Sequence, residues 1–400
     1  MRPLNPATLS PTLLQTIAEM VARSGVSSPK LGQAVMELSQ LFTKDREAIR
    51  QPYLDHPSQA AAYLSYFLPV NLSKVQVLLE EMPRPEPRGS LKVLDLGSGP
   101  GTGALAALDW WHRKNPGSTC LVEVVAVDNV KAALCQATEL WTQYAQAAGI
   151  QTATLRTVEG NLSRTVSAPF FESIRHSAPY DVIILANSLN EFHADVVDPI
   201  AAGSALVSEL LAWLVPSGTV MIVEPALRET SRTLQQIRDR LVQGRRCTIY
   251  SPCLHENSCP ALVNPFDWCH EERPWIPPVS IQQIDEQVGF IKDALKFSYA
   301  LLRKDGKTIV ERRPDRYRVV SELREMKGEK RAWLCNELGR QEVGRQDRLA
   351  SPQNAAFDDW HRGAIVQVEK IARKEKGGKV SALGRIEPHA TVEIVRSVED

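Results

Sequence analysis

The chain has 400 residues, of which 43% are hydrophobic, and its 47 lysines and arginines balance its 47 aspartates and glutamates. A chain of this length and apolar content can bury a large core and is expected to form two or three domains. The balanced charge excludes a global field that would attract nucleic acid, but it is compatible with a local basic surface. We find neither an apolar stretch long enough to span a membrane nor the regions of a signal peptide, so we expect a cytoplasmic protein without a membrane partner.

The first 87 residues are predicted to form a helical N-terminal cap. Leu13 and Ile17 share one face of a helix, and Leu31 and Val35 share a face of another. Two further helices are expected at 60–68 and 72–82, with a break near Pro69, before a stiff proline-rich linker at 83–87. The aromatic cluster at 63–67 is compatible with stacking on RNA bases and with packing in the core of the cap.

From residue 91 short apolar runs alternate with helical patterns. Strands are predicted at 92–96, 122–127, 153–158, 181–186 and 219–224. This alternation predicts a mostly parallel sheet covered on both faces, which is an α/β, Rossmann-like domain over 88–305. Ligands of such sheets bind at the carboxyl ends of the strands.

The first strand ends in an acid and a glycine-rich loop. Asp95 is followed by Gly97, Gly99 and Gly101, and then by small residues that indicate the start of a helix. The dinucleotide fingerprint is G-x-G-x-x-G, whereas this Asp-x-Gly-x-Gly-x-Gly pattern resembles motif I of class I methyltransferases that use S-adenosylmethionine (SAM). Asp128 ends the second strand, where it can accept hydrogen bonds from ribose hydroxyls. SAM is therefore the expected cofactor; NAD and a glycine turn without a ligand are the alternatives.

The turns after the third and fourth strands supply further candidates. In the methyltransferase pattern Asn161 would lie beside adenine, and Asn187 would face the methyl group. The Asn- or Asp-Pro-Pro-aromatic motif of amino-group methyltransferases is absent from 187–193, and neither of the fourth and fifth strand ends supplies a nucleophilic cysteine. Asn187, Glu191 and His193 are the only catalytic candidates, the last two as general acid or base, and a solvated loop explains them equally well. The sequence thus indicates a cofactor pocket more clearly than a catalyst.

A cysteine-rich loop at 245–280 is the second informative segment. Cys253, Cys259 and Cys269 lie within eighteen residues together with two histidines. The C-x5-C and C-x9-C gaps lack the close ligand pairs of structural zinc sites and favour an iron-sulfur cluster held by a wrapped loop, with zinc as the alternative. Cys335 is the natural fourth ligand and His255 the alternative; unrelated buried thiols would also explain the cysteines.

Taken in order, motif I, a late Glu-Pro, Cys-x-His-x4-Cys-Pro, Trp-Cys-His and a downstream lone cysteine resemble one family. It is the family of methyltransferase-like proteins associated with the small subunit of the mitochondrial ribosome, and its bacterial relatives. The resemblance covers roughly residues 55 to 365. It implies a 4Fe-4S cluster on Cys253, Cys259, Cys269 and Cys335, and a role in small-subunit assembly with binding to ribosomal RNA rather than DNA. The family tends to carry arginine in a segment like 63–69, where this chain has Phe67, which weakens an RNA contact there.

The end of the chain is predicted to be a small β-rich C-terminal module at 306–400, following a strand at 294–304 that closes the Rossmann-like domain. Residues 311–348 contain eleven lysines and arginines against eight acids, an excess compatible with phosphate contacts or with a solvated surface. The expected fold is thus a class I SAM methyltransferase fold with a helical N-terminal region, an inserted metal loop and a β-rich module.

Two functions are compatible with this fold. The first is a SAM-binding, 4Fe-4S-containing, methyltransferase-like protein that acts on or with the small ribosomal subunit, in assembly or translation, and has little or no catalytic activity. The second is an active SAM-dependent RNA or protein methyltransferase with a structural zinc loop.

Overall fold

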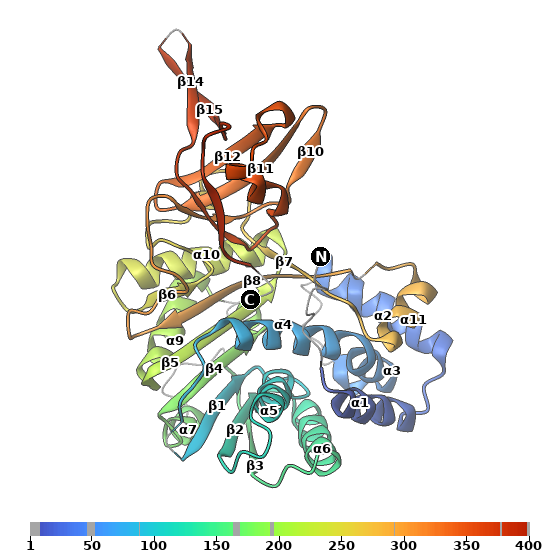
Figure 1. Cartoon of the computed structure of the whole chain (residues 1–400). Helices are drawn as coiled ribbons and strands as arrows, with labels where there is room; N and C mark the ends of the chain where they lie inside the picture. The colour runs from blue at the N-terminus through green and yellow to red at the C-terminus, as the bar shows by residue number, and fades with distance from the viewer. Residues whose placement is uncertain are drawn as a thin grey trace.

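A computed structural model describes residues 9–45, 53–87, 89–162, 169–192, 196–291, 293–376 and 378–397. An N-terminal group of helices lies beside an α/β layer, and a second β-sheet follows at the C-terminal end of the chain (Figure 1). Among the described residues, no helix has both the length and the apolar character needed to cross a membrane.

The α/β layer is built on an eight-stranded sheet with the order β3-β2-β1-β4-β5-β8-β6, and β7 also pairs with β8. The first five strands are parallel and lie where the sequence predicts them, whereas β8 is antiparallel to β5 and β6. Their bounds are β1 Ser90–Leu96, β2 Leu121–Asp128, β3 Ala153–Glu159, β4 Tyr180–Ala186, β5 Leu214–Pro225, β6 Thr248–Ser251, β7 Glu271–Pro274 and β8 Ala294–Arg303. The late strand predicted at 294–304 is β8, the last strand of this sheet in the sequence, and it lies between β5 and β6.

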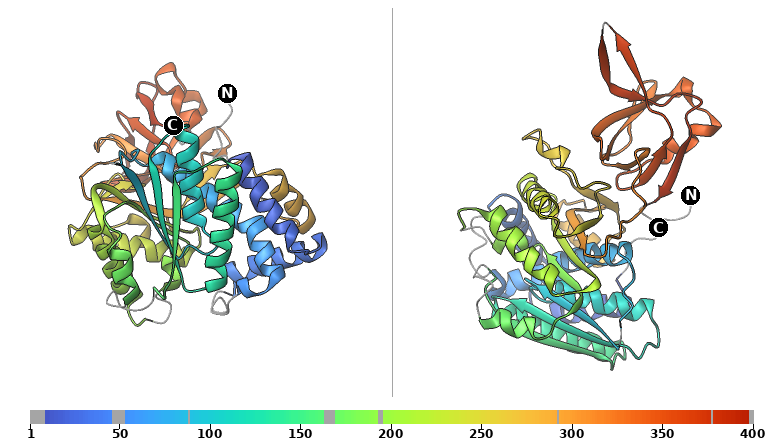
Figure 2. Two further views of the ribbon diagram at one scale, coloured as in Figure 1. Left: turned by 90° about the horizontal axis from the view of Figure 1, so that it is seen from below. Right: turned by 90° about the vertical axis from the view of Figure 1, so that its left-hand side faces the viewer.

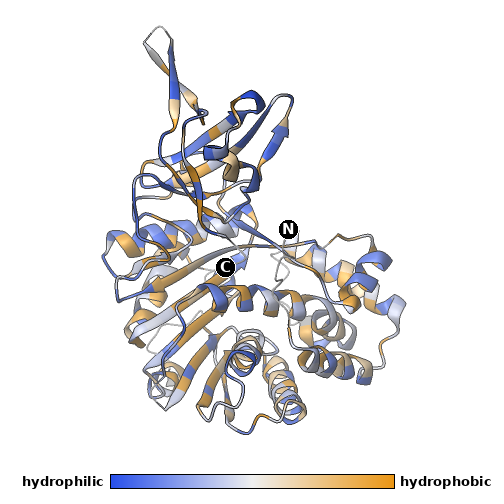
Figure 3. Cartoon of the chain, in the orientation of Figure 1, coloured by the Kyte–Doolittle hydropathy of each residue, from blue (hydrophilic) through white to orange (hydrophobic). Residues whose placement is uncertain are grey.

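Helices cover both faces of this sheet, as Figure 2 shows. Alternate residues of each strand enter separate cores: Val93 and Ile184 pack with α4, α5 and α6, whereas Leu94 and Ile183 pack with α7, α9 and α10. The central strands are accordingly almost wholly hydrophobic (Figure 3). The helices are α5 Thr102–Lys114, α6 Lys131–Ala147, α7 Pro169–Arg175, α8 Leu189–Phe192, α9 Pro199–Ala212 and α10 Arg228–Gln243.

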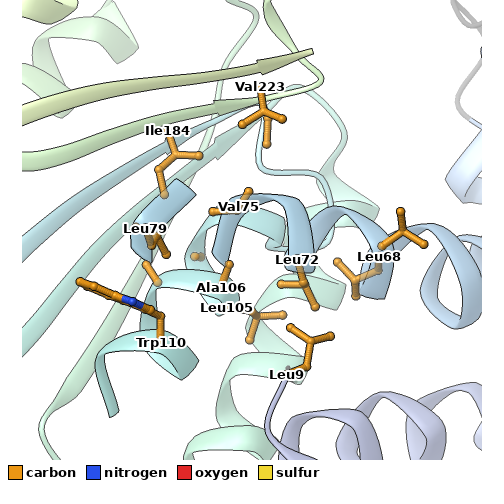
Figure 4. Packing of buried hydrophobic residues seen from close by; sticks show 14 of the residues in the cluster. Leu9, Leu68, Leu72, Val75, Leu79, Leu105, Ala106, Trp110, Ile184 and Val223 are labelled. Atoms are coloured by element: carbon orange, nitrogen blue, oxygen red, sulfur yellow. The ribbon is translucent and has the colours of Figure 1, made fainter. Parts of the chain in front are cut away.

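The N-terminal helices share the first of these cores. They are α1 Pro11–Arg23, α2 Ser28–Thr43, the 3-10 turn η2 Tyr53–Asp55, α3 Pro57–Ala62, the π-helix η3 Tyr63–Phe67 and α4 Leu68–Glu81. Leu72, Val75 and Leu79 of α4 point toward the small and apolar residues of α5 (Figure 4). The expected break at Pro69 is absent: α3, η3 and α4 follow one another without a gap, and the π-helix η3 lies directly before this proline, where the regular α-helical hydrogen-bond pattern is already interrupted. The division into domains at residues 87 and 305 remains a prediction.

The aromatic cluster packs inside the protein. Tyr66 is 1% exposed and donates a hydrogen bond of 2.5 Å to Asp285 in α11, Val279–Val288, which lies beside α2 although it comes much later in the chain (Figure 1). Phe42 meets the ring of Phe67 edge-on at 5.1 Å between centroids. The core interpretation of this cluster is therefore the one that the structure supports.

The C-terminal sheet follows the order β14-β15-β12-β11-β9-β13-β16, with β10 paired to β11. It has its own core around Leu334, Val343 and Phe357, so the prediction of a β-rich C-terminal module is confirmed. The strands are β9 Arg316–Val319, β10 Arg324–Met326, β11 Glu329–Asn336, β12 Gly339–Gln346, β13 Ile365–Val368, β14 Ala372–Lys376, β15 Lys379–Arg385 and β16 Val392–Arg396. Three 3-10 turns complete the described elements: η4 Pro260–Leu262, η5 Asp347–Leu349 and η6 Pro352–Asp359.

Candidate functional site

The glycine loop joins β1 to α5 in a conformation that depends on its glycines. Gly97, Gly99 and Gly101 have φ of 69°, 52° and 93°, which other residues rarely adopt. A Cβ at Gly97 would lie 2.3 Å from the Cβ of Ser188, whereas nothing lies within 4 Å of the corresponding position at Gly99. The turn after β4 therefore packs closely against the loop at Gly97, whereas the space next to the backbone of Gly99 is open.

Asp95 and Asp128 hold this loop from two sides. Asp95 is fully buried and accepts a 2.8 Å hydrogen bond from the N–H of Ala104 at the start of α5; burial raises the pKa of this carboxyl to about 7. This hydrogen bond ties the start of α5 to the end of β1. Asp128 accepts hydrogen bonds of 2.8 Å from the N–H of Gly99 and 2.9 Å from that of Val130, and burial raises its pKa. A carboxylate has about four acceptor positions, so Asp128 can also accept ribose hydroxyls.

The other candidates lie at the same carboxyl edge of the sheet. Asn187 follows β4 with a φ of 59°, and its Oδ1 atom is buried without a hydrogen-bond partner among the described residues. Asn161 follows Gly160, whose N–H donates to the carbonyl of Asp128 at 2.9 Å. Glu191 begins the second half of the short helix α8, while His193 lies outside the described residues. The structure thus gathers three of the candidates at one edge.

Tyr63 is a residue of this edge that the sequence did not single out for the site. Burial raises its pKa to about 12, opposed by hydrogen bonds with Thr102 and Asn71, while the charges of Glu191 and Asp128 raise it further. Its hydroxyl therefore lies close to both the glycine loop and the β4 turn. The π-helix that carries it is a form common at functional sites. The aromatic cluster was its only signal in the sequence, because the contact spans distant parts of the chain.

The four predicted metal ligands lie close together. Cys253, Cys269 and Cys335 line a single cavity. Burial raises the pKa of Cys259 and Cys335, and for each of them the charges of Cys269 and Cys253 add to this shift. The thiols of the loop and the thiol of Cys335 in β11 therefore lie close enough for their charges to interact. Among the described residues, however, no three cysteine, histidine or acidic side chains are placed to hold one metal ion together.

His255 lies at the same place. Its Nε2 atom is 3.8 Å from the Sγ of Cys335, and its Nδ1 atom is 3.1 Å from the carbonyl oxygen of Asn257. Burial lowers the pKa of His255 to about 4, so the ring is neutral at pH 7 and keeps a lone pair for a ligand or for the thiol. Both candidates for the fourth ligand thus reach the cysteine site.

Two arginines of α10 shape the cysteine-rich loop. Arg232 donates hydrogen bonds of 2.8 to 3.2 Å to four loop carbonyls, those of residues 261, 262, 264 and 267. Arg238 donates to the carbonyls of His255 and Asn257, and the neighbouring Asp239 accepts from the N–H of Cys259 at 2.9 Å. These contacts hold the loop through its backbone. Neither arginine was singled out from the sequence, since the carbonyl partners have no sequence signature.

Positive charge also surrounds the thiols. Burial and the charge of Cys253 raise the pKa of Cys269 to about 11, and Arg340 and Arg318 oppose this rise. Arg238 has the same opposing effect on Cys259. Because thiolate is the form that binds metal, these buried guanidinium groups would compensate the negative charge of a metal-bound set of cysteines.

The strand order, the antiparallel β8 and the glycine loop define a Rossmann-like protein of the class I SAM-dependent methyltransferase fold. Comparison with known families then identifies the family of the chain. The sequence profile of the family described as mitochondrial small ribosomal subunit Rsm22 matches residues 57–345, and the chain belongs to this family. This result confirms the resemblance inferred from the motifs.

Several solved methyltransferase structures are similar to the chain. The CcbJ methyltransferase from Streptomyces caelestis is 17% identical with a TM-score of 0.26; the match covers 39% of this chain and 49% of CcbJ, so the chain spans about half of its length. The plantazolicin methyltransferase BpumL, solved with SAH, is 14% identical over 72% of this chain and 98% of its own, with a TM-score of 0.33. A methyltransferase from Pyrococcus furiosus is 14% identical over 58% and 82%, with a TM-score of 0.30. A comparison with curated proteins finds no match.

Proposed function

We propose that this protein binds SAM on its glycine loop, carries a 4Fe-4S cluster on its four clustered cysteines, and acts with the small ribosomal subunit and its RNA. The observation that carries the proposal is the family match over residues 57–345, which includes the glycine loop and all four cysteines. The family description names the mitochondrial ribosome; for a bacterial relative the cytoplasm remains our prediction.

The residues at the carboxyl edge fit SAM. The open space next to Gly99 would hold the polar part of SAM against backbone N–H groups at the start of α5. Asp128 would accept the ribose hydroxyls, and Asn161 would lie beside the adenine. Asn187 would face the methyl end, where its unpartnered Oδ1 atom can accept a hydrogen bond. SAM itself supplies an electrophilic methyl group.

The cysteines fit an iron-sulfur cluster better than a single zinc ion. The C-x5-C and C-x9-C spacing of the loop cysteines lacks the close ligand pairs of structural zinc sites. Thiols spread around a shared cavity suit a larger group. The ligands would be Cys253, Cys259 and Cys269 with Cys335, or His255 in its place. Such a cluster would join the loop to β11 of the C-terminal sheet.

The described part of the site offers few groups for acid–base catalysis of methyl transfer. Glu191 and Tyr63 would be titratable groups near the methyl end, and burial raises the pKa of Tyr63 to about 12, far above the range of a useful base. An active RNA or protein methyltransferase with a zinc loop remains the second candidate, favoured by the open glycine loop. Incubation with tritiated SAM and small-subunit particles separates them: transfer of label supports the second candidate.

The first experiment is a count of iron, acid-labile sulfide and zinc per chain on anaerobically purified protein. Four irons and four sulfides, lost in Cys335→Ser but kept in His255→Ala, would support the cluster and its fourth ligand. The reverse pattern would identify His255 as the ligand. One zinc per chain without colour would refute the cluster and favour the second candidate.

A further inference from the structure

A β-hairpin extends from the C-terminal sheet, away from the rest of the molecule (Figure 1 and the right view of Figure 2). Its strands β14 and β15 pair with each other, and β15 pairs with β12 only at Gly384 and Arg385. The remainder of the described hairpin has no other strand beside it. A two-stranded ribbon without a packed face contributes little to stability, so the core of the sheet does not explain this extension.

The hairpin is strongly basic in a chain whose net charge is zero. Residues 370–385 contain one acid, Glu375, and no aromatic residue. Against that acid stand six basic residues: Lys370, Arg373, Lys374, Lys376, Lys379 and Arg385.

This charge differs from that of segment 311–348, which the sequence proposed for phosphate contacts. There most of the arginines pair with acids of the protein itself; Arg318 with Glu271 at 2.6 Å and Arg312 with Glu256 at 3.0 Å are examples. In the hairpin, Arg385 likewise pairs with Glu329, but Lys374 has no ion-pair partner in the described part of the chain and is exposed. An external partner can therefore reach the charge of Lys374.

The backbone of the hairpin directs this charge outward. Arg373 braces the two strands, since it donates hydrogen bonds to the carbonyls of Ser381 and Ala382 at 2.9 and 2.6 Å. The register shifts between Arg373 and Glu375, so Lys374 lies in a β-bulge, a feature that redirects side chains. Beyond it the register pairs Lys376 with Lys379.

We propose that hairpin 372–385 is an RNA-binding arm that contacts the phosphate backbone of ribosomal RNA without reading its bases. This inference rests on the proposed association with the small ribosomal subunit, and adds the surface that makes the contact. Lysine and arginine contacts to phosphates supply affinity and position. The lack of an aromatic residue excludes a base-stacking platform on the arm.

The test uses the full-length protein with Lys374, Lys376 and Lys379 changed to glutamine. The matched control changes Lys30, Lys44 and Lys131 to glutamine, three exposed lysines elsewhere on the chain. Binding of a fluorescein-labelled RNA stem-loop is measured by anisotropy from 0.05 to 0.5 M salt, and co-sedimentation with small-subunit particles is measured in parallel. Circular dichroism confirms that each variant is folded.

We expect the arm variant to bind the stem-loop roughly 100-fold more weakly at 0.15 M salt. The slope of log K against log salt should become shallower by about 2 to 3, since each lost phosphate contact reduces the magnitude of this slope by roughly 0.7 to 0.9. The control variant should match the unchanged protein. Equal affinity and slope in the arm variant would overturn the inference; if the unchanged protein still sediments with the particles, the proposed function survives. Failure of the unchanged protein to bind stem-loop and particles would overturn both.

Discussion

Replacing Glu81 by glutamine is expected to destabilise the folded protein by about 3 to 5 kcal/mol, because it leaves two buried guanidinium groups with a single carboxylate. Glu81, at the end of α4, accepts hydrogen bonds of 2.6 Å from Arg273, 2.5 Å from Ser251 and 2.6 Å from Tyr299. Arg273 in β7 also lies 3.3 Å from Glu271, which binds Arg318 of β9. Two carboxylates thus balance two arginines in a network that joins α4 to both sheets.

The acid side of the stability profile tests the same network. Burial raises the pKa of Glu81, but the charges of Arg273 and Arg318 and the hydrogen bonds outweigh it and lower this pKa to about 2. An unfolded glutamate has a pKa of about 4.3, so the unfolded state binds more protons between these values. The contribution of Glu81, on the order of 3 kcal/mol, is therefore complete above about pH 5 and lost as the pH falls toward 2.

Urea unfolding followed by tryptophan fluorescence measures both effects. Glu80→Gln is the matched control, because Glu80 is 44% exposed and pairs with Lys114 at the surface, where such a pair contributes about 1 kcal/mol at most. The double variant Glu81→Gln with Arg273→Met should recover part of the loss. If Glu81→Gln and Glu80→Gln unfold at the same urea concentration at pH 7, the reasoning is refuted. It is also refuted if the difference in stability between Glu81→Gln and the unchanged protein does not shrink on acidification.

Two further predictions concern the cofactor and the cluster. Gly97→Ala should weaken SAH binding at least tenfold in titration calorimetry, because its Cβ would lie 2.3 Å from that of Ser188. The control is Gly117→Ala, which also has a positive φ but has nothing within 4 Å of the new Cβ, and it should bind SAH normally. Equal binding of SAH by the two variants would contradict this prediction. Cys269→Ser should lose the cluster and be cut first after residue 300 in limited proteolysis, whereas Cys247→Ser should be cut like the unchanged protein. An unchanged pattern in Cys269→Ser would show that the cluster does not hold the C-terminal third.

The parts of the fold that were predicted correctly are those with a local cause. Four of the first five strands contain an apolar run, β3 alternates apolar and polar residues, and each strand ends where the chain turns toward a helix. The glycine loop was recognisable because positive φ and close packing restrict the residue type at Gly97 itself. The motif order was sufficient to indicate the family, since each motif is contiguous in the sequence.

The errors and omissions share a different cause. Strands β6 and β7 have only four residues each, too few for a periodic signal, so neither strand was predicted. Tyr63 and Glu81 lie at opposite ends of the helical stretch 63–81, and each contacts partners far away in the chain. Their roles depend on partners that no local pattern names.

The sequence by itself determined the alternation of strands and helices, the glycine loop around Gly99 and the identity of the clustered cysteines, because these follow from residue type and spacing. Only the tertiary structure decided that the thiol of Cys335 lies close to the loop cysteines, that Arg318 and Arg312 of segment 311–348 pair with acids of the protein, and that the basic segment 372–385 projects as a hairpin. The physical reason is that charge and thiol chemistry act through space, and the distances that govern them are set by how the two sheets pack rather than by the order of residues along the chain.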